Sequence, residues 1–359
     1  MCLYPRKIQN KKYVPNQKNG GVVPTLPVIG YDENNHEIYD ERICTVEIPC
    51  GRCIECCAQK AREWQVRLGE EIKDWKYMYF VTFTFSPEGL REILFKHNIK
   101  ECNAAAAFAL RHSLERYRKD TKKSYRHWFI TELGHEGTER IHIHGIIFME
   151  KPQEFQKIEE INTPTGHGWM CRWKYWKYGH IFVGDYVNER SINYVVKYME
   201  KIDEDHKTFV GQILCSPGIG RRYIDFLKKT GQQPFTYRPK QTRDYYRLNN
   251  GSKVKLPKYY GNKVWTEEER ELKWRDFLDR EAQTIQGNTY YYRETKNATL
   301  GNIIGKAQEN NKFLGYGNDS KEWRKQDHNL TKRMLQDQER KKQIAKMRAA
   351  LNMPTFGVN

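Results

Sequence analysis

The stretch that most constrains the fold of this chain is residues 140–148, where two histidines alternate with isoleucines before further branched and aromatic residues. This composition predicts a β-strand, in which alternate side chains share one face. His142 and His144 then point the same way, and Ile141 and Ile143 point to the opposite side. Two imidazoles on neighbouring same-face positions can bind one metal ion. For a His-x-His pair taken alone, two histidines on a solvated sheet face are the commoner explanation.

Charge and aromatic content indicate a polyanionic partner. The chain has 359 residues, enough for one large domain or two ordinary ones, and a net charge of +17. Its 23 tyrosines and 9 tryptophans often lie among lysines, as in residues 172–178. Basic groups contact phosphates and aromatic rings stack on bases, so the mixture favours single-stranded nucleic acid. An amphipathic segment with buried rings is the alternative for residues 172–178.

The cysteine and hydropathy patterns favour a reducing compartment. No apolar run approaches the ~20 residues of a membrane span, and the N-terminus has no hydrophobic signal region. Nine cysteines, an odd number, without an export signal argue against a disulfide framework. We therefore expect a protein of the cytoplasm with no membrane partner.

A cysteine cluster follows an N-terminal arm. Residues 1–45 are expected to be extended, with a hairpin near residues 30–36. Three thiols at short spacing on a tight turn can converge on one zinc ion, and these are Cys50, Cys53 and Cys56. The candidates for the fourth ligand are Cys2, Cys57 and, less favourably, Cys44. Such a zinc would be structural, because an all-thiolate site leaves no open position; buried cysteines at a helix start are the alternative.

Hydrophobic periodicity predicts an α+β core in which helices flank a sheet. Residues 57–75 have helical spacing that places Trp64 and Trp75 in a core, and residues 77–85 are apolar enough for a central strand. The other predicted elements are helix 103–119, strand 126–132, the His-x-His strand, strand 180–184, helix 185–201 capped by Asp185, and charged helices 266–285 and 320–351. These elements suggest an arm with the cysteines (1–56), a core (57–205) and a basic, partly helical C-terminal region (206–359).

The strand before the histidines supplies a carboxylate. Two strands joined by a short loop should pair as a hairpin, which would place Glu132 beside His142 and His144 as a third metal ligand. The less suitable candidates, which lie nearer the turn, are His135, Glu136 and Glu139. Mixed histidine and carboxylate ligation suits Mg²⁺ or Mn²⁺.

The helix predicted over residues 185–201 presents two phenols on one face. Tyr194 and Tyr198 are four residues apart, and Lys197 and Lys201 each follow one of them by three positions. A tyrosine, with a pKa of ~10, attacks a phosphodiester only if nearby cations lower that pKa and polarise the phosphate. The attack would leave a 5′-phosphotyrosine and a free 3′-OH, and the second tyrosine could later reverse it. Most Tyr-x-x-x-Tyr pairs are ordinary core or surface residues.

Taken in order, these residues resemble the His-hydrophobe-His (HUH) endonucleases, and more closely the rolling-circle replication initiators of microviruses, of the gokushovirus type. The His142-Ile143-His144 strand followed by the tyrosine and lysine helix carries the first resemblance. The closer one covers roughly residues 1–260. It adds the Cys50 to Cys56 element, strand 80–85, Glu132-Leu133-Gly134, Arg140 and Gly145 beside the histidines, Gly184 and Ser191-Ile192-Asn193 before Tyr194, and Ser216-Pro217-Gly218-Ile219-Gly220.

The resemblance implies a five-stranded antiparallel sheet with the metal site on its exposed face and the tyrosine helix packed nearby. It implies metal-dependent nicking of the viral plus strand at a single-stranded origin, extension of the 3′-OH by a host polymerase with a host helicase, and ligation of the displaced circle. Tyr194 and Tyr198 match the branch of the family in which two nucleophiles alternate.

Two other functions fit parts of the sequence. A zinc-stabilised DNA-binding protein without catalysis would explain the charge and the cysteines, but not the paired histidines and tyrosines. A phosphoesterase that uses the imidazoles directly would not need the tyrosines. Residues 301–307 depart from a P-loop, with one residue too few between the glycines and alanine in place of Ser or Thr, so no fused ATP-driven helicase is indicated.

Overall fold

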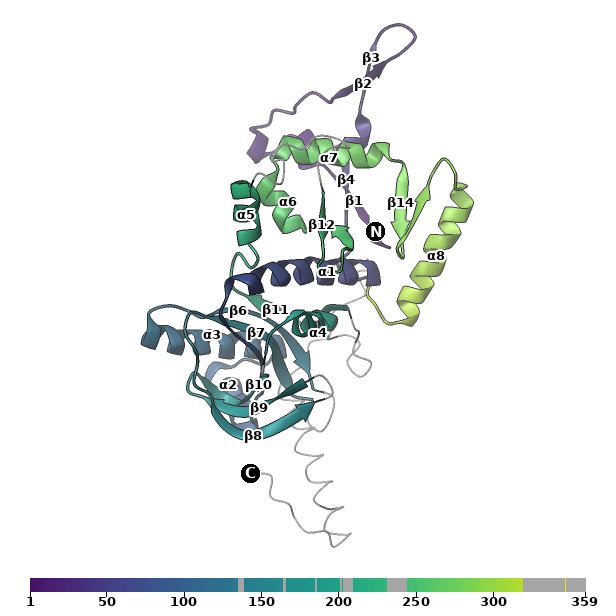
Figure 1. Cartoon of the computed structure of the whole chain (residues 1–359). Coiled ribbons are helices and arrows are strands. Elements are labelled where there is room, and N and C mark those ends of the chain that lie inside the picture. The colour runs from purple at the N-terminus through teal and green to yellow at the C-terminus, as the bar shows by residue number, and fades with distance from the viewer. Residues whose placement is uncertain are drawn as a thin grey trace. The chain divides into compact units, whose positions relative to one another are not determined.

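The computed structural model describes residues 1–134, 139–163, 166–184, 186–200, 202, 209–230, 244–318 and 346. The chain divides into two compact units, whose elements are labelled in Figure 1. The first unit contains Met1–Trp64 and Tyr223–Trp323, and the second contains Gln65–Arg222 and Arg324–Asn359. Among the helices of the described ranges, none is both long and apolar enough to cross a bilayer.

The second unit contains a seven-stranded antiparallel sheet. Its strands in spatial order are β11 (Ile213–Cys215), β6 (Arg126–Leu133), β7 (Ile141–Met149), β5 (Tyr77–Phe83), β10 (Trp176–Gly184), β9 (Gly166–Trp173) and β8 (Gln156–Thr163). The α+β class is confirmed, and β5 is the middle strand, as its apolar density predicted.

The expectation of five strands is wrong, because β8, β9 and β11 were not recognised in the sequence. The described side chains of β8 are exposed along almost their whole length, so this strand lacks the apolar alternation that marks a half-buried strand. β11 has three residues and is defined by its pairing with β6. Such edge strands gain order from a neighbour's unpaired backbone groups, which no local pattern reports.

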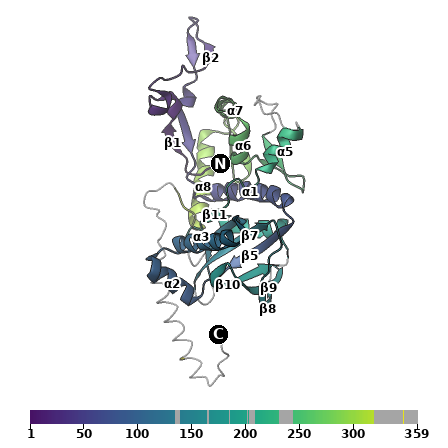
Figure 2. The ribbon, with the colours of Figure 1, turned by 90° about the vertical axis from the view of Figure 1, so that its left-hand side faces the viewer.

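One face of the sheet packs against α2 (Pro87–His97) and α3 (Cys102–Thr121), which lie together beside the strands in Figure 2. Odd-numbered strand residues such as Phe83, Ile143 and Ile181 fill this core and are fully buried. At Gly145 a Cβ atom would lie 2.0 Å from the carbonyl oxygen of Trp128, so the close approach of the strands requires glycine there.

The opposite face carries the even-numbered residues, and α4 (Glu189–Glu200) packs against it at β6. The helix buries its apolar residues, Ile192, Val195 and Val196. Asn188 caps its first turn, because its side chain accepts hydrogen bonds from the backbone N–H groups of Arg190 and Ser191 at 2.8 and 3.1 Å. The predicted cap, Asp185, lies outside the described residues.

The aromatic run at residues 172–178 forms the turn between β9 and β10. The rings of Trp173, Tyr175, Trp176 and Tyr178 are 3–5% exposed and belong to the core on the α2 and α3 side. The ring of Phe83 lies 6.2 Å from that of Trp173 and 4.5 Å from that of Trp176, measured between centroids. The interpretation of an amphipathic segment with buried rings is therefore confirmed, and base stacking on these four ring faces is wrong.

The first unit has, in its described residues, four two-stranded sheets and several helices. The expected hairpin near residues 30–36 is confirmed as β2 (Val28–Tyr31) and β3 (Glu37–Tyr39). The other strand pairs are β1 (Arg6–Gln9) with β4 (Thr45–Ile48), β12 (Tyr245–Arg247) with β13 (Lys253–Lys255), and β14 (Ala282–Ile285) with β15 (Asn288–Tyr291). The helices are α5 (Arg222–Thr230), α6 (Lys258–Val264), α7 (Glu267–Asp279) and α8 (Asn297–Phe313).

The C-terminal helix predictions were partly wrong. The helix predicted over 266–285 ends as α7 at Asp279, where the β14–β15 hairpin follows, and α8 was not predicted. The helix predicted over 320–351 falls almost wholly outside the described residues. The helix predicted over 57–75 is α1 (Ile54–Glu71), which buries Ala61 and Leu68, whereas Trp64 and Trp75 are only half-buried.

Glu71, at the end of α1, fastens a loop to the sheet. Its buried carboxylate pairs with the Arg126 guanidinium of β6 and accepts the backbone N–H of Gly220 at 2.6 Å. The same guanidinium donates to the carbonyl of Gly218 at 2.8 Å. Residues 216–220, the turn-rich segment after β11, are thus held in place by one ion pair.

Glu71→Ala should lower the free energy of unfolding by about 3 kcal/mol, because it leaves the Arg126 guanidinium without its carboxylate in a partly buried place. Urea unfolding followed by tryptophan fluorescence measures the loss. The matched control is Glu92→Ala, which removes an exposed carboxylate paired with Lys96 one turn away and should cost about 0.5 kcal/mol or less. Equal losses in the two variants would contradict the anchoring role.

Candidate metal and tyrosine site

The β6–β7 hairpin brings together the three residues predicted to hold a divalent ion. Glu132 lies directly opposite His142 in the strand register, and His144 is two residues further along the same face. The Nε2 atom of His144 is 2.9 Å from Oε2 of Glu132. The structure therefore places Glu132 beside the His-x-His pair. Of the less suitable candidates, Glu139 lies outside the strands, and His135 and Glu136 lie outside the described residues.

The ring of His144 is oriented by Thr82 on β5. The Nδ1 atom of His144 is 3.0 Å from the Thr82 hydroxyl, which leaves Nε2 on the side of Glu132. This Nε2 atom is buried and makes no hydrogen bond to the described residues, since the nearby carboxylate is not aligned with it as an acceptor. A buried ring nitrogen of this kind, whose partner nitrogen is held by an outer residue, fits a metal ligand.

His142 is suited to ligation because its imidazole stays neutral. Burial, followed by the positive charges of His144 and Arg140, lowers the pKa of His142 to about 3. A neutral imidazole keeps the lone pair that a metal ion needs. Two imidazoles and one carboxylate thus fit a divalent ion that accepts mixed nitrogen and oxygen ligands.

Helix α4 places both predicted tyrosines at this site. The ring of Tyr198 stacks on that of His144, with centroids 5.0 Å apart and 23° between the planes. The hydroxyl of Tyr198 donates a hydrogen bond of 2.6 Å to the hydroxyl of Tyr194. Tyr194 in turn packs edge-on against Phe80 of β5, at 5.7 Å between centroids. The two phenol oxygens therefore lie together on the histidine face of the sheet.

The surroundings of Tyr198 oppose its ionisation. Burial first, then the negative charge of Glu132 and the hydrogen bond to Tyr194, raise the pKa of Tyr198 far above its usual value. Lys197 is exposed, and Lys201 lies outside the described residues, so neither lysine accounts for activation of the phenol in the described structure. A cation bound beside Glu132 would offset that carboxylate and favour the phenolate.

Sequence reasoning missed Thr82 and Phe80, which orient the site from β5. The signal was the alternation of the strand at residues 77–85, which places both side chains on one face. Only the pairing of Thr82 with His144 shows that this is the histidine face. The missing information was the register between two strands about sixty residues apart.

A second candidate site is formed by four cysteines of the first unit. The sulfur atoms of Cys2, Cys50, Cys53 and Cys56 all lie within 4.8 Å of one another. This group selects Cys2 as the fourth member, and Cys57 instead donates its thiol to the carbonyl of Arg52. Such a cluster can hold a metal ion, with a tetrahedral set of thiolates typical of structural zinc.

Backbone amides point at these sulfurs. The N–H of Cys50 donates to the sulfur of Cys2 at 3.2 Å, and the N–H of Cys53 donates to that of Cys50 at 3.3 Å. Hydrogen bonds from neighbouring thiols, that of Cys2 first, lower the pKa of both Cys50 and Cys53. The thiolate form binds metal, so the cluster favours ligation at its centre.

Comparisons with known proteins agree with this site. Residues 78–203, from β5 to just beyond α4, match the family model of the replication-associated protein ORF2. The chain is 26% identical to replication-associated protein VP4 of Bdellovibrio phage phiMH2K, over 69% of this chain and 78% of that protein. It is 24% identical to replication-associated protein ORF2 of Spiroplasma virus 4, over 82% and 89% of the two chains. No solved structure matches. The resemblance to microvirus-type replication initiators is confirmed.

The low pKa of His142 predicts acid sensitivity of the metal-free protein. In the unfolded chain the imidazole takes up a proton below about pH 6.5, whereas in the folded protein it stays neutral to about pH 3. The stability gained from neutral His142 is therefore complete above about pH 6.5 and falls with pH below it, by at most about 1.4 kcal/mol per unit. Urea unfolding in EDTA, between about pH 7 and about pH 5, should show a shallower pH dependence for His142→Gln than for the wild type. Parallel curves would show that this imidazole titrates normally.

Proposed function

We propose that this chain, whose relatives are replication-associated proteins of phages, starts replication by nicking single-stranded viral origin DNA with a tyrosine and later rejoins it. The observation that carries the proposal is the position of Tyr198, stacked on His144 and hydrogen-bonded to Tyr194. Two phenols and a set of metal ligands meet there on one face of the sheet, within the segment that matches the family.

Glu132, His142 and His144 would hold Mg²⁺ or Mn²⁺, which would supply positive charge to the scissile phosphate and the attacking oxygen. Helix α4 presents the phenol oxygens, and contacts with Phe80 and His144 fix the two rings. In the nicking step the bond between tyrosine oxygen and phosphorus forms, and the bond from phosphorus to the 3′ oxygen breaks. The phenol proton ends on the leaving 3′ oxygen, so the products are a 5′-phosphotyrosine and a 3′-OH.

Two tyrosines would let the exchange run twice. While one carries the 5′ end, the other can attack the next copy of the origin, and the new 3′-OH then displaces the first tyrosine and closes the circle. One phosphodiester replaces another in each step, so little free energy is lost. Lys197 and Lys201 would contact the phosphates, and a host helicase and polymerase in the bacterial cytoplasm would extend the 3′-OH.

The cysteine cluster favours a second candidate function, a zinc-stabilised DNA-binding protein without catalysis. That function needs the charge of +17 and the four thiols, but it leaves the stacking of Tyr198 on His144 without a purpose. In the main proposal the same zinc is structural and holds the N-terminus to the start of α1.

Incubation of the protein with circular single-stranded viral DNA and Mn²⁺ should give a protein–DNA adduct that survives denaturation. Tyr194→Phe and Tyr198→Phe should each keep part of the adduct, and the double variant should lose it by about 10⁴-fold or more, because no nucleophile is left. His144→Ala should also lose the adduct while DNA still binds. The control Tyr186→Phe changes an exposed tyrosine and should react normally. Cleavage by the double variant would instead support the histidine phosphoesterase.

Purified protein should contain one zinc per chain, as measured by mass spectrometry of the metal content. Cys53→Ser should lose the zinc and lower the thermal stability, because a structural zinc site contributes on the order of 10 kcal/mol to folding. The matched control is Cys57→Ser, whose thiol lies outside the cluster and binds a backbone carbonyl. Zinc retained in Cys53→Ser, or lost equally from both variants, would contradict the assignment.

A further inference from the structure

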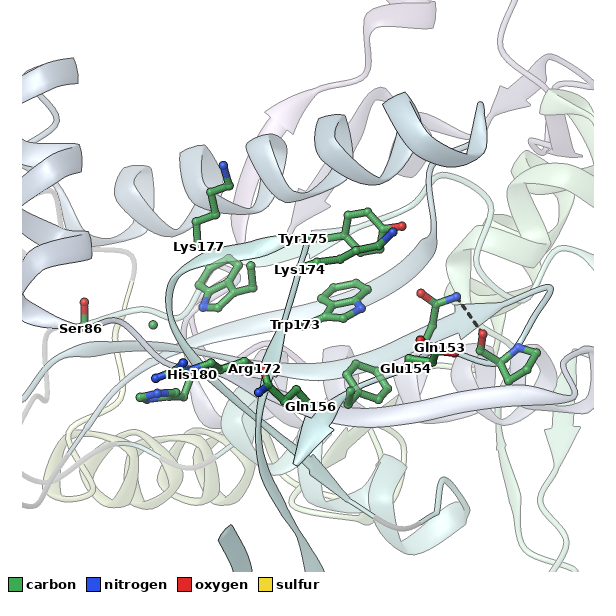
Figure 3. Close-up of a pocket in the computed structure, with 14 residues that line it drawn as sticks. Ser86, Gln153, Glu154, Gln156, Arg172, Trp173, Lys174, Tyr175, Lys177 and His180 are labelled. Atoms are coloured by element: carbon green, nitrogen blue, oxygen red, sulfur yellow. Dashed lines mark hydrogen bonds between the residues drawn. The ribbon is translucent and has the colours of Figure 1, made fainter. Parts of the chain in front are cut away.

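A groove of about 1000 Å³ lies at the turn end of the β9–β10 hairpin (Figure 3). Its walls come from that hairpin, from residues 152–156 before β8, and from Ser86 at the start of α2. Ligand pockets commonly measure about 300–1,000 Å³, so this groove has room for an extended ligand. Nothing in the proposed nicking chemistry uses it.

Part of the groove lies on the same face of the sheet as the histidines. His144 is paired with Thr82, which is paired with Phe182, and Phe182 is paired with Met170. Arg172 is two residues beyond Met170 and therefore shares this face. Three strand spacings and two residues along β9 separate it from His144, or about 15 Å. A strand held at His144 can reach the groove within a few nucleotides.

The charges lining the groove suit a polyanion. Its lining contains three cationic side chains, Arg172, Lys174 and Lys177, against a single carboxylate, Glu154. Lys174 is already paired with Asp120 at 2.9 Å. Arg172 and Lys177 are exposed and form no ion pair with the described residues, so both are available to a ligand.

The groove also offers aromatic surface that the core does not consume. Trp173 and Trp176 form part of its lining but are almost completely buried. Phe155 and His180 are only half-buried, and His180 lies close to Arg172 in Figure 3. Phe155 is backed by Tyr79 and Trp173, with centroids at 5.0 and 5.7 Å, so its position is fixed. Half-exposed rings next to unpaired cations are the combination that binds single-stranded nucleic acid.

We propose that this groove binds the single-stranded DNA that flanks the scissile phosphate, with phosphates on Arg172 and Lys177 and bases on Phe155 and His180. The inference rests on the proposed function for its substrate, but it assigns a separate site. Its role is to hold the strand while the tyrosines at the histidine site act.

The test is fluorescence anisotropy with fluorescein-labelled oligothymidylate, in the Tyr194→Phe/Tyr198→Phe background so that nicking plays no part. Arg172→Ala/Lys177→Ala should weaken binding about tenfold and reduce the slope of log K against log salt by about 1.4, since each phosphate contact on a single strand contributes about 0.7. Phe155→Leu should weaken binding and leave the slope unchanged, because it removes stacking and no charge.

The matched control is Lys100→Ala/Arg111→Ala, which removes the same charge from exposed positions at and just before α3, the helix on the other face of the sheet. It should stay within about twofold of the background protein, and Arg172→Lys/Lys177→Arg should restore both the affinity and the slope. Binding by the Arg172 and Lys177 double alanine variant that equals the control would overturn the groove assignment. Normal groove binding by a wild-type protein that forms no adduct with viral DNA would instead contradict the proposed function alone.

Discussion

The antiparallel pairing of β6 with β7 is the constraint on which the candidate site depends. It sets Glu132 opposite His142 and leaves Oε2 of that glutamate 2.9 Å from Nε2 of His144. A slip of one residue would turn the carboxylate toward the α2 and α3 core, because side chains alternate along a strand. Ile141 and Ile143, buried on the other face, resist such a slip. The hydrophobic core therefore holds the polar site in register.

The site itself is arranged around a positive charge that the protein does not supply. Glu132 and burial both disfavour the Tyr198 phenolate, and the one described lysine of the helix motif, Lys197, is exposed. His142 is kept neutral by burial and by neighbouring cationic groups. Neutral imidazoles, a carboxylate and a reluctant phenol are mutually consistent when a divalent cation lies among them. In that arrangement the same charge orders the ligands and favours the nucleophile.

The sheet separates two kinds of chemistry by face. The face under α2 and α3 is sealed by apolar and aromatic side chains, and it includes the rings of Trp173 and Trp176. The other face carries the histidines, the tyrosine helix and, toward the hairpin turn, Arg172. Strand alternation alone produces this division, so aromatic and basic residues adjacent in sequence have different roles. The lysines of the aromatic run can meet a polyanion while its rings stabilise the core.

The sequence by itself determined β5, β7, α3, the His-x-His face and three of the four thiols, because strand and helix periods and close cysteine spacing are properties of neighbouring residues. Glu132 was within reach because a short loop implies a hairpin. Only the tertiary structure decided that Cys2 rather than Cys57 completes the cluster, that Tyr198 lies against His144, and that β8 and β11 extend the sheet. These outcomes depend on contacts between residues far apart in the chain. Their energies come from burial and pairing, which no local pattern encodes.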